Sequence, residues 1–254
     1  MNICVFVCNK KYFGKFINTC SELITNGKYK GLICLVIGDD LNNHKLLNHD
    51  IIKNNNIIVK YFPDIQFPND FYFINNNINS DGRNITKKFQ WHKLHLFNIY
   101  FKQWDGVFYI DCGMKILDDI SPFLDIITEN TLLAHSDAYP LYKWKLHGQF
   151  DKKNSEYFNR LNNNYDLNSD YFQSGILLYD TQIIENVTYN NLLKLAIDYP
   201  ISRTNEQGIM NLYFNCDKNI WKQLKLRNEH TNLYDYWCRD KKDTKYIIVK
   251  NKNW

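Results

Sequence analysis

The stretch that decides the fold is VFYIDCGMKILDDISPFL, residues 107–124. It begins with an apolar run, 107–110, whose β-branched and aromatic residues are typical of a strand buried on both faces of a largely parallel sheet. The run stops at Asp111, which Cys112 and Gly113 follow. Because ligands in open α/β sheets bind beyond the carboxyl ends of strands, this ending predicts a ligand-binding edge. A simple turn-capping role for Asp111 is the alternative.

Segments on both sides of this stretch alternate between strand and helix patterns. The expected strands are 2–9, 31–38, 57–62, 107–110, 131–135 and 171–179, and the expected helices are 12–25, 87–101, 189–199 and one that opens at 118–122. A strand, a helix and a second strand from the first residue onward indicate an α/β fold. We therefore predict a Rossmann-like, mostly parallel central sheet flanked by helices.

Length and composition agree with a globular protein. A chain of 254 residues fits one large α/β domain, and we expect a single domain over 1–254. Hydrophobic residues at 44% and charged residues at 23% are ordinary values. The net charge of +4 suits an anionic ligand but is too diffuse for nucleic acid, which we do not expect as a partner.

Several motifs that would define other classes are missing from the sequence. The seven cysteines are scattered without a C-x-x-C pair or zinc-ligand spacing, so we predict buried, reduced thiols in a cytoplasmic protein. Neither a signal peptide nor a membrane span is apparent. The sequence has no G-x-G-x-x-G, P-loop or G-x-S-x-G motif, which argues against dinucleotide enzymes, NTPases and serine hydrolases.

Two features have two interpretations each. Residues 69–86 are Asn-rich and mostly polar apart from 71–74, as in a mobile lid over a site or an inert surface insertion. His92 and His95 lie three residues apart on one expected helix, where they are either metal ligands or simply a helix start and a surface position.

The motifs of the chain resemble those of one family. YIDCG (109–113) followed by DISPFL (119–124) resembles the YLDAD…DIxxLF segment of GT-A fold glycosyltransferases, above all the glycogenin-like, family-eight retaining enzymes. In the same order, WHKLH (91–95) resembles TKLH, YFQSGILLY (171–179) resembles FNSGVMLI, NEQGIMN (205–211) resembles DQGILN, and the terminal KNKNW (250–254) resembles the end of HFxGxxKPW. The frequent Asn, Lys and Ile residues also resemble the style of AT-rich protists or large DNA viruses.

This resemblance implies a hexosyltransferase. It would move a hexose from UDP-glucose, UDP-galactose or UDP-GlcNAc to a sugar, protein or lipid acceptor, with retention. Residues 1–125 would form the nucleotide-sugar-binding half and 126–254 the acceptor-side half, and a homodimer is left open. In the family, an acid-x-acid motif holds Mn²⁺ or Mg²⁺, but here Gly113 stands at the second acid and the C-terminal His is missing. Asp111 is then the expected metal ligand, with Asp118 or Asp137 as candidates for another.

The same resemblance assigns site residues by position. The implied catalytic residues are Asp111, Gln173, Glu206 and Gln207. The implied donor-binding residues are Val7, Cys8, Asn9, Tyr12, Lys93, Asp111, Cys112, Gly113 and Lys252, with Lys250 as an alternative to Lys252. For Lys93 the other interpretation is a solvated helix lysine.

Four functional hypotheses stay open at this point. The first is a weakly metal-dependent transferase. The second is a metal-independent transferase in which lysines neutralise the leaving diphosphate. The third is a UDP-sugar-binding protein that has lost catalysis, and the fourth is an interaction protein that uses the fold as a scaffold.

Overall fold

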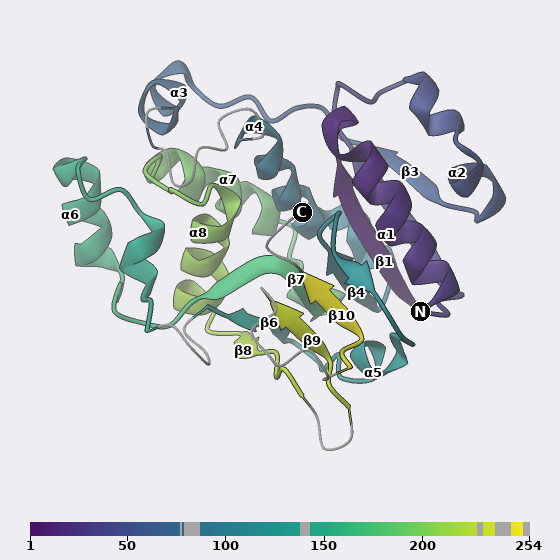
Figure 1. Ribbon diagram of the computed structural model, residues 1–254. Helices are drawn as coiled ribbons and strands as arrows, with labels where there is room; N and C mark the ends of the chain where they lie inside the picture. The colour runs from purple at the N-terminus through teal and green to yellow at the C-terminus, as the bar shows by residue number, and fades with distance from the viewer. Residues whose placement is uncertain (77, 79–86, 138–142, 228–230, 237–244, 251–254) are drawn as a thin grey trace.

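The computed structural model describes residues 1–76, 78, 87–137, 143–227, 231–236 and 245–250. Its main sheet has seven strands, β1 (Asn2–Cys8), β2 (Leu32–Ile37), β3 (Ile58–Tyr61), β4 (Gly106–Ile110), β6 (Leu132–Ser136), β7 (Phe172–Asp180) and β8 (Trp221–Gln223). A smaller sheet contains β5 (Lys115–Ile116), β9 (Tyr234–Tyr236) and β10 (Ile248–Lys250). Figure 1 shows the small sheet in front of β4 and β7.

Helices surround the main sheet. The α-helices are α1 (Phe13–Thr25), α2 (Asp50–Asn54), α3 (Asn69–Asn75), α4 (Lys87–Gln90), α5 (Ser121–Leu124), α6 (Ser155–Asn164), α7 (Thr188–Asp198) and α8 (Glu206–Met210). Short 3₁₀ helices are η1 (Lys10–Tyr12), η2 (Lys45–Asn48), η3 (Trp91–Phe97), η4 (Ile99–Gln103), η5 (Leu146–Gln149) and η6 (Thr181–Ile183), and η7 (Asn211–Asp217) is a π-helix. None of the helices in the described part of the chain combines the length and apolar character needed to cross a membrane.

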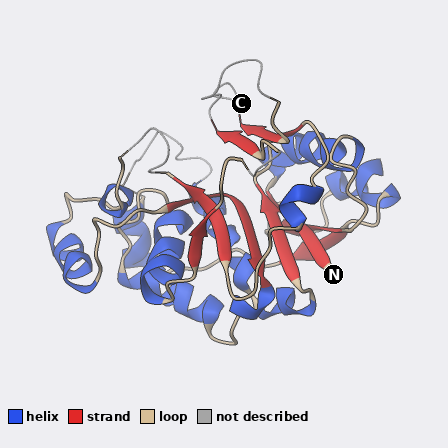
Figure 2. Ribbon diagram, turned by 90° about the horizontal axis from the view of Figure 1, so that it is seen from below, coloured by secondary structure: helices blue, strands red, loops and turns tan. Residues whose placement is uncertain are grey.

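The order of strands in the main sheet is β3-β2-β1-β4-β7-β6-β8. Strand β1 pairs in parallel with β2 and β4, β2 with β3, and β6 with β8, whereas β7 runs antiparallel to both β4 and β6. All six strands expected from the sequence form, and the prediction of a mostly parallel α/β sheet flanked by helices is confirmed. Figure 2 shows the strands of this sheet between layers of helix.

Two hydrophobic cores lie on the two faces of the main sheet. In β1, Ile3, Val5 and Val7 pack on one face with η3, η4 and α7, while Cys4, Phe6 and Cys8 pack on the other with α1, α2 and α5. Successive side chains of a strand point to opposite faces, so an uninterrupted apolar run supplies both cores at once. This explains why the first strand reads as NICVFVC rather than as alternating apolar and polar residues.

The expected helix 87–101 is interrupted, contrary to the prediction. The segment forms α4, then η3, and then η4 after a break at Asn98, whose backbone is extended (φ −74°, ψ 146°). The Asn98 side chain accepts a hydrogen bond from Tyr100 N at 3.0 Å and so begins η4. Asparagine favours such caps because its side chain competes for backbone hydrogen bonds, and this overrides the apolar periodicity.

Two further expectations need correction. Residues 69–75 form α3 rather than a polar loop, because Phe71 is buried against Phe67 and Trp91. The rest of the segment, apart from Asn76 and Ile78, lies outside the described residues. The rings of His92 and His95 are buried, so neither is a surface position.

Candidate active site

The site lies at the carboxyl end of β4. The chain runs from β1 to β2 and β3 on one side and then crosses to β4 on the other side of β1, which creates a topological switch point between β1 and β4. Crevices outside the strand ends at such points bind ligands in open α/β sheets. Asp111 comes directly after β4, and its backbone N–H donates to Gly175 O of β7 at 2.9 Å.

The Asp111 carboxylate has three side-chain neighbours. The Tyr109 hydroxyl donates to Oδ1 at 2.6 Å, Lys93 Nζ lies 2.8 Å from Oδ1, and Lys250 Nζ lies 3.4 Å from Oδ2. Burial by itself would raise the pKa of Asp111, but the two ammonium groups outweigh it and lower that pKa to about 2. Asp111 is therefore a fully ionised carboxylate that two lysines neutralise.

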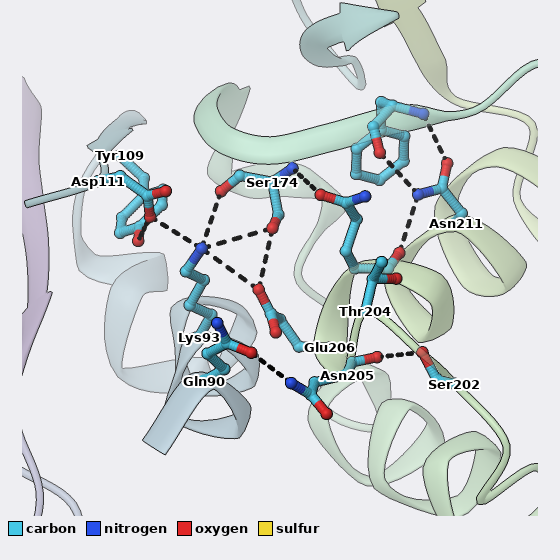
Figure 3. A network of polar contacts seen from close by, with 12 residues as sticks. Gln90, Lys93, Tyr109, Asp111, Ser174, Ser202, Thr204, Asn205, Glu206 and Asn211 are labelled. Atoms are coloured by element: carbon cyan, nitrogen blue, oxygen red, sulfur yellow. Dashed lines mark hydrogen bonds and ion pairs between the residues drawn. The ribbon is translucent and has the colours of Figure 1, made fainter. Parts of the chain in front are cut away.

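Lys93 joins two acids from different parts of the chain (Figure 3). Its Nζ lies 3.2 Å from Glu206 Oε1, and Ser174 Oγ donates to the same oxygen at 2.9 Å. Burial opposes the charge of Lys93, yet Asp111 and Glu206 together raise its pKa. Glu206 is only 3% exposed, and burial raises its pKa despite the lysine. No described residue hydrogen-bonds its Oε2, which leaves a buried carboxylate oxygen for another group.

An unusual turn aims Glu206 into this cluster. Asn205, just before α8, has φ 52° and ψ −120°, a conformation that glycine adopts more easily than other residues. Its side-chain amide donates to Gln90 Oε1, and its carbonyl accepts from Ser202 Oγ at 2.6 Å. At Gly208 an added Cβ would come within 2.5 Å of Ser202 Oγ, so the close packing of α8 requires glycine there. These contacts hold the first turn of α8 against α4.

Amide side chains continue the network beyond Glu206. Gln207 accepts a hydrogen bond from Ser174 N at 3.0 Å and donates to Gln149 Oε1 at 2.8 Å. Gln173 donates to Asp137 Oδ1 at 2.5 Å. The structure thus brings together the expected residues Lys93, Asp111, Glu206 and Gln207 through direct contacts with one another or with Ser174.

The expected nucleotide-side residues lie at the end of β1. The Cys112 thiol donates to Val7 O at 3.5 Å, which links the end of β1 to the turn after β4. Cys8 is completely buried, and Asn9 Oδ1 accepts from Tyr12 N at 3.0 Å at the start of η1. Lys252 lies outside the described residues. The assignment of the residues at the end of β1, of Cys112 and of Lys252 to donor binding stays a prediction.

The described residues around Asp111 do not fit a divalent cation. Among the described residues, no three His, Cys, Asp or Glu side chains gather where an ion could bind. Both oxygens of Asp111 already face lysines, and Gly113 offers no side-chain oxygen. Asp137, the alternative ligand, accepts hydrogen bonds from Tyr171 and Gln173 at 2.5 Å each. A site for Mg²⁺ or Mn²⁺ needs several hard oxygen ligands free to turn toward the ion.

Sequence reasoning missed two members of the network. The sequence pattern gives Tyr109 no side-chain role at the site, although a residue two positions before Asp111 lies on the same side of β4 and can reach its carboxylate. Gln149 and the helix α6 both lie between the predicted strands 131–135 and 171–179, where the sequence predicts no element. No sequence signal points to Gln149, because η5 is brought to Gln207 only by tertiary packing.

Comparisons with known proteins place this architecture among glycosyltransferases. No protein-family model matches the sequence, and neither does any curated protein. Among solved structures, the galactosyltransferase LgtC in complex with donor and acceptor sugar analogues matches with a TM-score of 0.64 at 13% identity, over 99% of this chain and 87% of that one.

Two further structures are similar. Mouse xyloside xylosyltransferase 1 has a TM-score of 0.50 at 11% identity, over 94% of this chain and 87% of its own. The glycosyltransferase GlyE of Streptococcus pneumoniae has a TM-score of 0.54 at 14% identity, over 88% of this chain and 45% of its own. At such identities the likeness concerns the fold. The chain therefore has the GT-A glycosyltransferase fold.

Proposed function

We propose that this protein is a glycosyltransferase that moves a hexose from a UDP-sugar to a sugar, protein or lipid acceptor, with retention of configuration. Residues 1–125 would hold most of the nucleotide, and 126–254 would face the acceptor. UDP-glucose, UDP-galactose and UDP-GlcNAc are the donors to test first.

One observation carries this proposal: a largely buried cluster of two carboxylates and two lysines at the switch point of a GT-A fold. Asp111, Lys93 and Glu206 form a continuous chain of ion pairs, although they come from the turn after β4, from η3 and from α8. Buried ion pairs are costly to desolvate and contribute little net stability. Their concentration at a ligand-binding edge therefore favours a functional role over a structural one.

The chemistry of sugar transfer suits this cluster. The anomeric carbon gains positive charge in the transition state while the diphosphate leaves with growing negative charge. Preorganised cations near the diphosphate stabilise its growing negative charge, and a carboxylate or amide near the sugar stabilises the positive charge on the anomeric carbon. Glu206 and Gln207 would lie on the sugar side, with the unpartnered Glu206 Oε2 available to a donor hydroxyl or to the charge at the anomeric carbon. Lys93 would hold Glu206 in place.

The proposal is tested by UDP binding and by donor turnover. We expect calorimetry to detect UDP binding and at least one of the three UDP-sugars to release UDP when acceptors are added. UDP binding without turnover, across donors and acceptors, would favour a binding protein that has lost catalysis. A chain with no affinity for UDP would instead be an interaction scaffold.

Glu206→Gln sharpens this test. The amide keeps the shape of the side chain but removes its negative charge, so we expect kcat to fall by about 100-fold or more with UDP affinity within a few-fold of wild type. Glu156→Gln, on the exposed side of α6, is the matched control and should leave kcat unchanged. Equal kcat for Glu206→Gln and wild type would exclude Glu206 from catalysis.

A further inference from the structure

We propose that the site holds the diphosphate of its donor with the ammonium groups of Lys15 and Lys250 in place of a divalent cation. This inference rests on the proposed function, since it concerns how the same donor is bound. It selects the metal-independent alternative over the Mn²⁺ or Mg²⁺ that the family resemblance implies.

The first step concerns the carboxylate that would hold the ion. Asp111 Oδ1 already accepts a hydrogen bond from Tyr109 and an ion pair from Lys93, and Oδ2 faces Lys250. A cation would have to displace at least one lysine from this carboxylate. Like charges a few ångströms apart repel each other strongly in a partly buried site, so metal binding here would be weak.

The second step concerns the position where the family has its second acid. Gly113 has φ +96°, a conformation that residues with a Cβ rarely adopt. An added Cβ would also come within 3.1 Å of Lys15 Cδ. An acid at position 113 would need both this strained backbone conformation and a shift of the Lys15 stem. Restoring the acid would therefore require a change in the conformation of the turn as well as a substitution at Gly113.

The third step concerns Lys15 itself, which lies in the first turn of α1. Its stem packs over Gly113, and its ammonium lies 5.3 Å from the centre of the Tyr12 ring, beside the end of β1. No carboxylate of the described residues forms an ion pair with it. Lys15 therefore brings a positive charge to the turn after β4, and none of the carboxylates in the described ranges pairs with it.

The fourth step separates Lys250 from Lys93. Lys93 lies 2.8 Å from Asp111 and 3.2 Å from Glu206 with a side chain only 14% exposed, so two acids hold it firmly. Lys250, at the end of β10, makes a longer contact of 3.4 Å with Asp111 and is 27% exposed. An incoming phosphate can share Lys250 without breaking the buried pair. Lysine is well suited to this because its ammonium acts as a flexible point charge toward phosphate.

Calorimetric titration of UDP tests the inference directly. Wild-type protein is titrated once in EDTA and once in excess MnCl₂, and we expect the two dissociation constants to agree within about two-fold. Lys15→Met and Lys250→Met, titrated in EDTA, should each weaken UDP binding by about 10-fold, while Lys15→Arg and Lys250→Arg should keep most of the affinity. Lys153→Met, which removes an exposed lysine from the loop before α6, should bind as wild type does.

The possible failures are distinct. If Mn²⁺ lowers the dissociation constant of UDP 10-fold or more, this inference is overturned and the proposed function stays intact. The same holds if Lys15→Met and Lys250→Met both bind UDP with wild-type affinity. Absence of UDP binding in EDTA and in Mn²⁺ alike would overturn the proposed function and this inference with it. The comparison of wild-type protein in two buffers needs no variant, so a variant that does not fold leaves the inference open to refutation.

Discussion

At the scale of single residues, the turn after β4 depends on one glycine. Gly113 is the only glycine with positive φ in the described part of the chain, and it lies between the ion-paired Asp111 and the apolar Met114. Met114 is buried. The Thr19 hydroxyl donates a hydrogen bond to the Met114 carbonyl at 2.9 Å and accepts one from Gly113 N at 2.9 Å. The turn therefore ties α1 to the end of β4.

Replacing Gly113 with alanine should destabilise the protein. The positive φ costs a residue with a Cβ about 1 kcal/mol or more, and the new methyl group would displace the stem of Lys15. The free energy of unfolding, measured by urea denaturation, reports this loss.

Gly14 is the matched control for Gly113. It lies in the first turn of α1, where an added Cβ meets nothing within 4 Å. Gly14→Ala should stabilise the protein by about 0.5–1 kcal/mol, because alanine loses less backbone entropy in a helix. Equal effects of the two substitutions would contradict the role of the Gly113 backbone.

At the scale of elements, η3 carries both Lys93, which pairs with Asp111 and Glu206, and a histidine within a buried aromatic stack. The His95 ring lies between Phe62, at 4.4 Å between ring centres, and Tyr189 of α7, at 5.0 Å. Burial, with a smaller effect of His92, lowers the pKa of His95 to about 3. His95 therefore stays neutral and fixes η3 between β3 and α7, with Lys93 two residues earlier on the same element.

This stack predicts a loss of stability in mild acid. In the unfolded chain His95 binds a proton below about pH 6.5, whereas in the folded protein it stays neutral down to about pH 3, so protons favour unfolding between these values. From pH 7 to pH 5 this contribution amounts to about 2 kcal/mol.

The variant His95→Phe isolates this contribution, since phenylalanine can stack on Phe62 and Tyr189 but cannot titrate. Urea denaturation at pH 7 and pH 5 should show wild-type protein losing about 2 kcal/mol more than the variant on acidification. An identical loss in the two proteins would mean that another group governs the acid response.

At the scale of the whole molecule, one hydrophobic core lies on each face of the main sheet, and four cysteines are buried in these cores. Cys4, Cys8, Cys20 and Cys34 are buried free thiols, as the sequence predicts, while Cys112 and Cys216 are half-buried and Cys238 lies outside the described residues. Burial raises the pKa of Cys20 and of Cys34 to about 12 and holds that of Cys4 well above its usual value. Reaction of these three thiols therefore requires that the cores open.

Thiol labelling measures this opening. With iodoacetamide under native conditions, the peptide that contains Cys4 should be alkylated about 1,000-fold or more slowly than the same peptide in urea, because an ordinary domain unfolds only rarely. The peptide that contains Cys216 should react much faster in the native protein. Comparable native rates for the two peptides would show that the sheet opens locally at β1.

The main sheet and the approximate position of the site could be predicted from the sequence. Strands β1, β2 and β4 are nearly uninterrupted apolar runs, and such runs have few other ways to satisfy both burial and backbone hydrogen bonding. Asp111 was identified because an acid followed by a small residue and glycine interrupts such a run. These signals are local, so neighbouring residues suffice to carry them.

Other features were decided only by tertiary structure. A strand pattern specifies burial but not its partner, so the antiparallel insertion of β7 between β4 and β6 could not be predicted. The pairing of Lys93 with both Asp111 and Glu206, and the stem of Lys15 over Gly113, join residues far apart in the chain. Their energies depend on distance and burial in three dimensions. The sequence determined which strand end carries the site, and only the packing of three distant segments determined that lysines surround its carboxylate.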